Sequence, residues 1–181
     1  AIYKIVEEEK IDIVIIGPEQ PLVDGLVDYL NNKNIKVFGP NKFAAQLEGS
    51  KIFMKNFCKV NNIPTASFGV FDNFDGAYNF IKKKHTPIVV KADGLASGKG
   101  VYICNTREEA LKNTKEILDG KFKSSSKVVL EEFLQGEELS YFVIVDQNSY
   151  KFFGAAQDHK RVEEGDAGLN AGGMGAYSPS P

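Results

Sequence analysis

A glycine-rich loop between two short apolar runs limits what this 181-residue chain can fold into more than any other segment does. The stretch is Pro87–Cys104, with the sequence PIVVKADGLASGKGVYIC. Both apolar runs contain β-branched residues, which predicts a strand, a loop and a second strand. Glycines let a backbone approach a ligand closely and turn several N–H groups towards one anion. Because Lys91 and Lys99 also place a cation on each side of the loop, we predict a flap that binds phosphate.

The loop differs from two common phosphate-binding motifs. A Walker A loop has four residues between its glycines and a Ser or Thr after its Lys, whereas Gly94 and Gly98 enclose three residues and Lys99 is followed by Gly100. A Rossmann turn leads into a helix, whereas the residues after Gly100 are strand-like. Kinases place a strand–loop–strand flap over a nucleotide. On this stretch alone, a plain hairpin loop with solvated lysines remains the alternative.

The composition argues against some classes of protein. The formal net charge of −2 argues against a nucleic-acid partner, because such proteins usually carry a basic excess. No apolar run is long enough to span a membrane and no signal peptide is visible, so we expect no membrane partner. Cys58 and Cys104 lie in apolar patterns without a CxxC pair, which is typical of buried free thiols in a reducing cytoplasm.

Residues 1–40 alternate between helical and strand patterns. The order is a helix at 1–10, a strand at Ile11–Ile16, a helix at Leu22–Asn31 and a strand at Ile35–Phe38. This is a βαβ unit, whose parallel strands place ligands at their carboxyl ends. Gly17, Pro18 and Glu19 follow the first strand directly. They are candidate ligand contacts, and a simple turn with a solvated Glu19 is the alternative.

Two short helices are expected next. Asn41 is placed to cap a helix through Leu47, and Ser50 to cap a helix at Lys51–Val60. The second helix is predicted to bury Ile52, Phe53, Phe57 and Val60. Lys51 lies in its first turn, where a cation opposes the helix dipole. An anionic partner would explain that placement, and a solvated Lys is the alternative.

An α+β module is predicted from about residue 65 to 132. Thr106 and Glu109 form a capping-box pattern at the start of its second helix. The expected strands are Thr65–Phe71, Pro87–Lys91, Val101–Cys104 and Lys127–Glu132, and the expected helices are Asn73–Lys83 and Thr106–Leu118.

The rest of the chain divides into strands and a loop. Alternating patterns predict strands at Leu139–Val145 and Tyr150–Gln157. The extended segment before them, Glu131–Ser140, could present backbone groups to an adenine edge and a carboxylate to a ribose, although acids on a solvated strand edge are the alternative. After Gln157 the periodicity ends, and we expect a long loop without secondary structure. Because Asp158–Arg161 puts an acid, a His and two cations beside glycines, this loop is predicted to bind substrate.

In this order, the pieces resemble the ATP-grasp superfamily and, more closely, the phosphoribosylamine–glycine ligase (glycinamide ribonucleotide synthetase) family. The stretches that carry the resemblance are GPEQPLVDG, FGP, AAQLEGSK, NIPTASF, VVKADGLASGKGV, EEFLQGEELS, QDHKRV and GGMGAYSP. The resemblance implies an α/β chain with a partial ATP-grasp fold, preceded by the end of a Rossmann-like βαβ domain. The implied divisions are the end of that substrate-binding domain at 1–40, a helical linker at 41–64, the lid subdomain with its flap at 65–132, and the start of the second subdomain at 133–181.

The resemblance also implies a reaction. ATP, 5-phosphoribosylamine and glycine would give glycinamide ribonucleotide, ADP and phosphate, through a glycyl phosphate and with Mg²⁺ or Mn²⁺, as a step of purine synthesis in the cytoplasm. The implied ATP contacts are Lys51, Lys91, Gly94, Ser97, Gly98, Lys99, Gly100, the backbone of Glu132 and Leu134, and Glu138 on the ribose. The implied substrate contacts are Gly17, Pro18, Glu19, Asp158, Lys160, Gly172, Gly173, Met174 and Gly175, with His159 and Arg161 as catalytic residues.

The chain also departs from the family pattern. It has Leu169-Asn170-Ala171 where the family has Pro-Asn-Thr, which puts the role of that loop in doubt. The family's amino-terminal glycine-rich turn and its Glu/Asn pair for Mg²⁺ are absent, and the chain does not begin with Met. We interpret it as an internal fragment that is inactive by itself. Another ATP-grasp ligase, such as a carboxylase or carbamoyl-phosphate type, and a nucleotide-binding module without chemistry remain the rival hypotheses.

Overall fold

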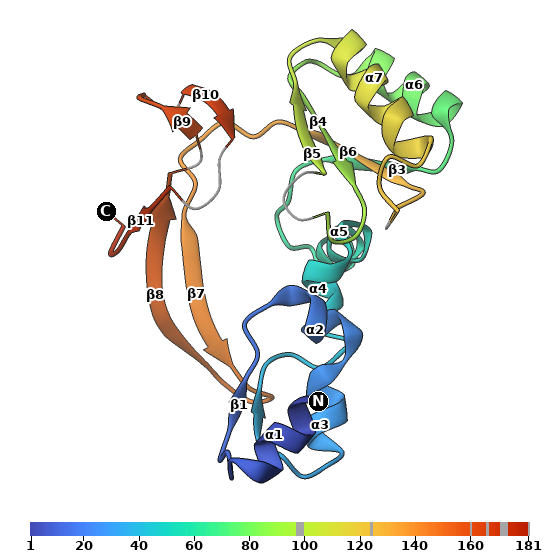
Figure 1. Ribbon diagram of the computed structural model, residues 1–181. Helices are drawn as coiled ribbons and strands as arrows, with labels where there is room; N and C mark the ends of the chain where they lie inside the picture. Colours follow the sequence, from blue (N-terminus) through green and yellow to red (C-terminus); the bar gives the residue numbers. More distant parts are fainter. Residues whose placement is uncertain (97–99, 124, 160, 166, 171–173, 181) are drawn as a thin grey trace. The chain divides into compact units, whose positions relative to one another are not determined.

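The computed structural model describes residues 1–96, 100–123, 125–159, 161–165, 167–170 and 174–180. The chain forms two compact units, Ala1–Leu134 and Gln135–Pro181. The first unit contains both helices and strands, whereas the described elements of the second are all strands (Figure 1). The α/β class predicted from the sequence is confirmed.

The first 40 residues contain a parallel strand pair and three helices. Val14 pairs with Val37 between the two strands. The paired strands are shorter than the apolar runs that predicted them, because only two residues of each run meet a partner strand. The elements are α1 (Ile2–Glu8), β1 (Val14–Ile15), α2 (Glu19–Asp24), α3 (Leu26–Asn31) and β2 (Val37–Phe38).

The single helix expected at Leu22–Asn31 is instead two helices, and the expectation is wrong. Gly25 separates them with a φ of +92°, a left-handed conformation that glycine adopts at low cost. The first of the two begins earlier than predicted, at Glu19. Its Pro21 lies in the first turn, where a missing N–H leaves no helical hydrogen bond unmade.

Two further helices, α4 (Gln46–Gly49) and α5 (Lys51–Val60), lead towards the main sheet. Asn41 Oδ1 accepts a hydrogen bond from the N–H of Ala44 at 2.8 Å, but it caps a turn that precedes α4 and not the predicted helix itself. Ser50 caps α5 as predicted, by accepting from the N–H of Phe53 at 3.1 Å.

The buried side of α5 differs from the prediction. Phe57 is 42% exposed and Val60 is 79% exposed, whereas Lys55 is only 2% exposed. The Phe53 ring stacks on Phe57 and meets Phe43 edge-on, so this aromatic row packs on itself. Apolar spacing predicted the wrong face because polar groups elsewhere in the fold satisfy the Lys55 ammonium.

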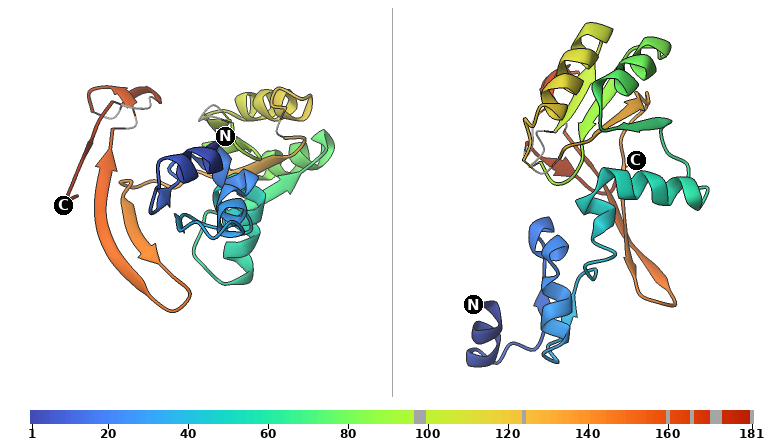
Figure 2. Two further views of the ribbon diagram at one scale, coloured as in Figure 1. Left: turned by 60° about the horizontal axis from the view of Figure 1, so that its bottom comes forward. Right: turned by 90° about the vertical axis from the view of Figure 1, so that its right-hand side faces the viewer.

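Four antiparallel strands form the main sheet of the first unit, in the order β3-β6-β4-β5. Two helices lie side by side on one face of this sheet (Figure 2). The elements are β3 (Phe68–Phe71), α6 (Phe74–Lys83), β4 (Ile88–Ala92), β5 (Val101–Cys104), α7 (Arg107–Leu118) and β6 (Val128–Glu132). All six occur where the sequence predicts them, although β3 begins three residues late.

The start of α7 confirms the predicted capping box. Thr106 Oγ1 accepts from the N–H of Glu109 at 3.1 Å, and Glu109 Oε2 accepts from the N–H of Thr106 at 3.4 Å. The pattern was readable because a capping box is made by residues three positions apart.

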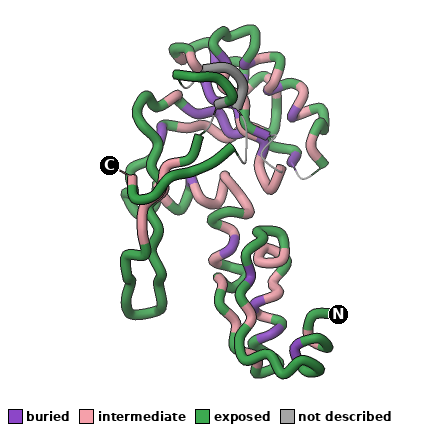
Figure 3. Tube along the Cα trace, turned by 60° about the vertical axis from the view of Figure 1, so that its left-hand side comes forward, coloured by how far each residue is buried: buried purple, intermediate pink, exposed green. Residues whose placement is uncertain are grey.

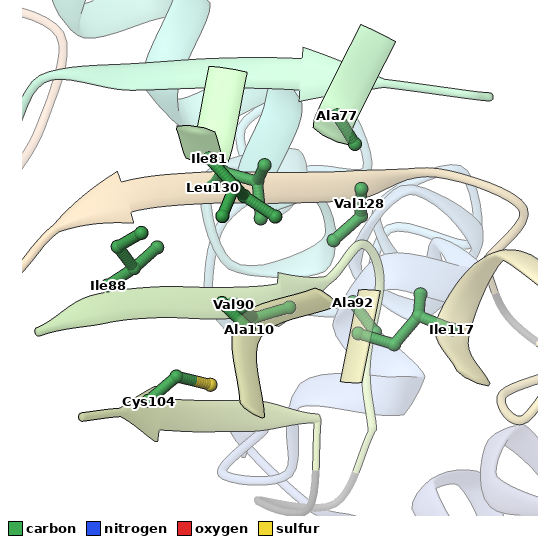
Figure 4. Packing of buried hydrophobic residues seen from close by; sticks show 10 residues of the cluster. All are labelled: Ala77, Ile81, Ile88, Val90, Ala92, Cys104, Ala110, Ile117, Val128 and Leu130. Carbon is green, nitrogen blue, oxygen red and sulfur yellow. The ribbon is translucent and has the colours of Figure 1, made fainter. Parts of the chain in front are cut away.

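The core lies between the sheet and these two helices (Figure 4). It contains Ala77, Ile81, Ile88, Val90, Ala92, Cys104, Ala110, Ile117, Val128 and Leu130. Successive side chains of a strand point to opposite faces. Val90 and Leu130 face the helices, so their neighbours Lys91 and Glu131 lie on the other face of the sheet.

The second unit consists of strands with no described residue fully buried. Figure 3 shows its long hairpin as exposed and intermediate. The hairpin pairs β7 (Ser140–Val145) with β8 (Tyr150–Asp158), and β11 (Ala176–Tyr177) extends it beside β8. A separate pair joins β9 (Arg161–Glu163) and β10 (Ala167–Asn170).

The expectation of a long loop without secondary structure after Gln157 is therefore wrong. Much of this segment forms antiparallel strand pairs. Backbone hydrogen bonds make these pairs, so they do not require alternating apolar side chains, which is the pattern the prediction relied on.

Among the described residues, no helix combines the length and the apolar character needed to cross a membrane.

Candidate functional site

Asp93 ties the loop after β4 to the start of α5. Its carboxylate accepts from the Ser50 hydroxyl at 3.0 and 3.2 Å and from the N–H of Ile52 at 3.1 Å. The N–H of Asp93 donates to Ser125 Oγ at 3.0 Å. A carboxylate at this end of a helix pairs with N–H groups that lack helical partners and matches the helix dipole. Asp93 thus holds the loop against the helix that carries Lys51.

Lys51 points at the same loop, where its Nζ donates to the carbonyl oxygen of Gly94 at 2.8 Å. Burial lowers the pKa of Lys51 below its usual range, and the Lys91 ammonium acts in the same direction, while the Asp93 carboxylate opposes both. Desolvation disfavours a charged form and a nearby opposite charge favours it. A bound anion would therefore suit this half-buried cation.

Two glycines shape the ends of the loop. Gly94 has a φ of +77°, in the left-handed region that favours glycine. A Cβ on Gly100 would lie 2.7 Å from the Cβ of Ala96 and 3.3 Å from that of Ala92, so a side chain would force the loop to move. The glycine requirement inferred from the sequence has a steric cause at both positions.

A carboxylate flanked by two lysines lies on the sheet face away from α6 and α7. Glu131 Oε2 is 2.9 Å from Lys91 Nζ and 3.1 Å from Lys55 Nζ. Glu131 is buried, and its Oε1 has no hydrogen-bond partner among the described residues. A buried oxygen without a donor is costly, so Oε1 is an acceptor available to a ligand or a water molecule.

A cavity of about 440 Å³ brings several predicted site residues together. Residues from α2, the end of α4, the start of α5 and the glycine loop line it, namely Glu19, Gln20, Glu48, Lys51, Gly94, Leu95, Ala96, Gly100 and Val101. A larger hollow of about 700 Å³, between the end of α5 and β3, contains none of the predicted residues. We favour the smaller one because it combines a partly buried cation with backbone of a glycine loop, the features that bind phosphate.

The predicted adenine contacts lie at and beyond the end of β6. Glu132 donates its backbone N–H to the oxygen of Ser67 at 3.1 Å, and its side chain accepts from the N–H of Ser67 at 2.8 Å. The hydrogen bonds from the backbone and side chain of Ser67 lower the pKa of the Glu132 carboxyl. Because its N–H is already used, a backbone contact from Glu132 to adenine would have to come from its carbonyl oxygen. Leu134 is 64% exposed.

In the second unit, the structure brings two predicted residues into contact. The N–H of His159 donates to the oxygen of Gly175 at 3.0 Å, and the His159 ring lies 6.1 Å from the Tyr177 ring. Asp158 ends β8 opposite Ala176. Met174 and Glu138 are exposed.

Several predicted residues fall outside what the structure describes. Arg161 lies in β9, where its backbone is described and its side chain is not. Ser97, Gly98, Lys99, Lys160, Gly172 and Gly173 lie outside the described residues. Gly17 and Pro18 are described and exposed, directly before α2.

Three charged residues near the glycine loop escaped the sequence analysis, namely Lys55, Asp93 and Glu131. Asp93 directly follows β4 and precedes Gly94, and this position of an acid before a glycine loop could have marked it as a candidate site residue. Lys55 is four residues after Lys51 and so lies on the same side of α5. Glu131 offered no local signal, because only the pairing of β4 with β6 places it beside Lys91.

The described residues contain no group of three or more His, Cys, Asp or Glu side chains that could hold a metal ion. Mg²⁺ prefers a set of oxygen ligands that includes carboxylates. The described part of the chain therefore does not fit a magnesium site.

Two sequence models of one family match adjoining parts of the chain. The N domain of phosphoribosylglycinamide synthetase matches residues 1–48, and the ATP-grasp (A) domain of the same synthetase matches residues 49–181. The chain belongs to the phosphoribosylglycinamide synthetase family. The resemblance inferred from the sequence motifs is confirmed.

Curated relatives in the phosphoribosylglycinamide synthetase family are named phosphoribosylamine–glycine ligase. One from Mesorhizobium japonicum is 51% identical over 176 residues, which is 97% of this chain and 41% of the relative. One from Haemophilus influenzae is 49% identical over 183 residues and covers 100% of this chain and 43% of the relative. The chain thus spans about two fifths of the length of these relatives.

Solved structures agree with the family and its fold. A phosphoribosylamine–glycine ligase from Thermotoga maritima is 40% identical, with a TM-score of 0.74 over 81% of this chain and 38% of that one. D-alanyl-alanine synthetase A from Vibrio cholerae has a TM-score of 0.64 at 19% identity, over 81% of this chain and 44% of that one, and shares the fold alone. The predicted ATP-grasp fold is confirmed.

Proposed function

We propose that this chain carries the ATP-binding part of a phosphoribosylamine–glycine ligase. The observation that carries the proposal is the Lys51 side chain bonded to the glycine loop at the wall of a cavity, with Lys91 on the strand that leads into that loop. The relatives that share about half of its residues bear the ligase name. The proposed reaction joins 5-phosphoribosylamine and glycine into glycinamide ribonucleotide at the cost of ATP, in purine synthesis.

The first step is phosphoryl transfer. A glycine carboxylate oxygen bonds to the γ-phosphorus as the bond from phosphorus to the ADP oxygen breaks, which gives glycyl phosphate and ADP. Lys51 and Lys91 counter the negative charge of the phosphates. The loop from Gly94 to Gly100, including Ser97, Gly98 and Lys99, covers the phosphates and keeps water from the acyl phosphate.

The second step is amide formation. The amine nitrogen of phosphoribosylamine bonds to the glycyl carbonyl carbon, phosphate leaves with its oxygen, and the nitrogen releases a proton. In this proposal the side chains of His159 and Arg161 contact the reacting groups. The segments that line the glycine and product site are Asp158, Lys160, Gly172, Gly173, Met174 and Gly175, while Gly17, Pro18 and Glu19 lie near the ribosylamine.

The nucleoside is assigned to residues at and after the end of β6. The backbone of Glu132 and Leu134 holds adenine, and Glu138 accepts a ribose hydroxyl. Magnesium or manganese belongs to the proposed reaction, but no step is assigned to it because the described residues do not supply its ligands. We place the reaction in the cytoplasm, since Cys58 and Cys104 are free thiols.

Phosphate release by the protein at the full length of its curated relatives tests this function. Release from ATP should require glycine and phosphoribosylamine together, and Lys51→Met should lower kcat/KM by about 100-fold, the usual cost of removing one group that stabilises transition-state charge. Lys59→Met is the matched control, because Lys59 is an exposed lysine of the same helix. Release that depends on a different acid or amine would favour another ATP-grasp ligase, and nucleotide binding without release would favour a non-catalytic module.

A further inference from the structure

The two lysines that share Glu131 Oε2 have unequal surroundings. The Lys55 side chain is 3% exposed and the Lys91 side chain is 24% exposed. Lys55 comes from α5, whereas Lys91 comes from β4, one residue before the end of that strand and beside the glycine loop. The same carboxylate oxygen thus has one enclosed cation and one that reaches solvent.

Lys55 is fully occupied where it lies. Its Nζ donates to Thr65 Oγ1 at 2.7 Å and to the carbonyl oxygen of Ala66 at 3.2 Å, and it pairs with Glu131 Oε2 at 3.1 Å. An ammonium has three N–H donors, so these three acceptors account for all of them. The Phe68 ring, with its centroid 5.5 Å away, adds a further favourable contact.

Lys91 is held less completely. Among the described residues, Lys91 Nζ donates a hydrogen bond to Glu131 Oε2, at 2.9 Å. Two lysines against one carboxylate leave this cluster with a surplus of one positive charge. An anion beside the glycine loop could therefore draw Lys91 away while Glu131 keeps Lys55.

We propose that Lys55 is a positioning residue that serves as the permanent counter-ion of Glu131 and so allows Lys91 to exchange that carboxylate for a nucleotide phosphate. The inference rests on the proposed ATP site. Without Lys55, every departure of Lys91 would leave a buried carboxylate with no cation, and an uncompensated buried charge is strongly unfavourable. Lys55 touches no phosphate in this mechanism and acts only through Glu131.

Calorimetric dissociation constants for ADP and adenosine, measured on the native protein, test this role. Lys55→Met should raise the dissociation constant for ADP by at least about tenfold. It should leave adenosine binding unchanged, because adenosine has no phosphate to draw Lys91 from Glu131. A purely structural role for Lys55 would weaken both ligands alike. Lys59→Met, the exposed lysine on the same helix, should change neither.

A second arm removes the carboxylate. In a Glu131→Gln background, Lys55→Met should have no further effect on ADP binding, because Lys55 then has no buried charge to balance. This double variant also covers the case in which Lys55→Met alone fails to fold, since removing both charges of a buried pair is tolerated better than removing one. Equal losses of ADP affinity in the two backgrounds, or equal losses of ADP and adenosine, would overturn the proposal.

Thermal unfolding without nucleotide separates this inference from the proposed function. Lys91→Met should lower the midpoint less than Lys55→Met does. Lys91→Met leaves Glu131 paired with the enclosed Lys55, whereas Lys55→Met leaves it only the partly exposed Lys91 and also removes the hydrogen bonds to Thr65 and Ala66. If the unaltered protein binds no ADP, the proposed function fails while this comparison still decides the role of Lys55. Equal midpoint losses would overturn the counter-ion role.

Discussion

At the scale of single residues, the site depends on charges that the fold holds away from water. Lys51 is the clearest case, because its pKa is lowered first by burial and then by Lys91. The Asp93 carboxylate is the strongest influence in the other direction, and Glu48 and Glu131 also raise the Lys51 pKa. A bound phosphate would attract this cation and would raise the pKa of Lys51 again.

The expected consequence is a pH-dependent affinity for ADP. The free protein has a lowered Lys51 pKa and bound phosphate raises it, so between these two values the complex holds more protons than the free protein. Binding should therefore take up protons, and affinity should fall as pH rises through the lowered Lys51 pKa towards the ordinary lysine pKa. The folded-state pKa of Lys51 lies below its unfolded-state pKa. The free energy of unfolding of the nucleotide-free protein should therefore rise with pH between these two pKa values.

Calorimetry in buffers of different ionisation enthalpy measures this proton uptake directly. Lys51→Arg is the control, since an arginine stays charged throughout the range and should flatten the profile. A profile that is flat in the unaltered protein, or equally steep in Lys51→Arg, would contradict the assignment.

At the scale of elements, Asp93 links three parts of the chain that are far apart in sequence. It accepts from Ser50 and Ile52 at the start of α5, and its backbone donates to Ser125 ahead of β6. The glycine loop therefore starts from an anchored residue. Accurate placement of Lys51 relative to Gly94 depends on this anchor.

Asp93→Ala should lower the free energy of unfolding by about 1–2 kcal/mol, the upper part of the range for loss of a helix cap. Chemical denaturation checks this value. Asp119→Ala is the matched control. Among the described residues, Asp119 pairs with the exposed Lys115, at 2.8 Å, and such pairs contribute less than about 1 kcal/mol. Equal losses in the two variants would mean that Asp93 has no special part in joining the loop to α5.

At the scale of the whole molecule, the two units differ in how they are stabilised. The first has a core between a four-stranded sheet and two helices. The second has a long hairpin whose described residues are all exposed or intermediate. An isolated hairpin is marginally stable in water, so the first unit should supply the cooperative unfolding of the chain.

Circular dichroism of shortened chains tests this difference. Residues 1–134 should melt cooperatively at nearly the midpoint of the full chain, and residues 135–181 should show no cooperative transition. Residues 1–127 are the control, because they lack β6, a strand that pairs with both β3 and β4. A cooperative melt of 135–181 would show that its stability comes from contacts other than a buried core.

Patterns within a few residues of one another were read correctly from the sequence. The cap at Ser50, the capping box at Thr106 and the strand Val101–Cys104 all occur as predicted. The errors have a common origin. In both cases the spacing of apolar side chains did not decide the structure. The left-handed conformation of Gly25 divides the helix, and pairing with distant segments forms the strands after Gln157.

The sequence by itself determined the ATP-grasp family and the glycine loop with its lysines, because these depend on residue types at fixed local spacing. Only the tertiary structure decided which groups lie next to each charged side chain. Lys55 is buried because Thr65, Ala66 and Glu131 converge on it, and Lys91 meets Glu131 because β4 and β6 are neighbours in the sheet. Electrostatic energies depend on distance and burial, and the order of residues along the chain specifies neither directly.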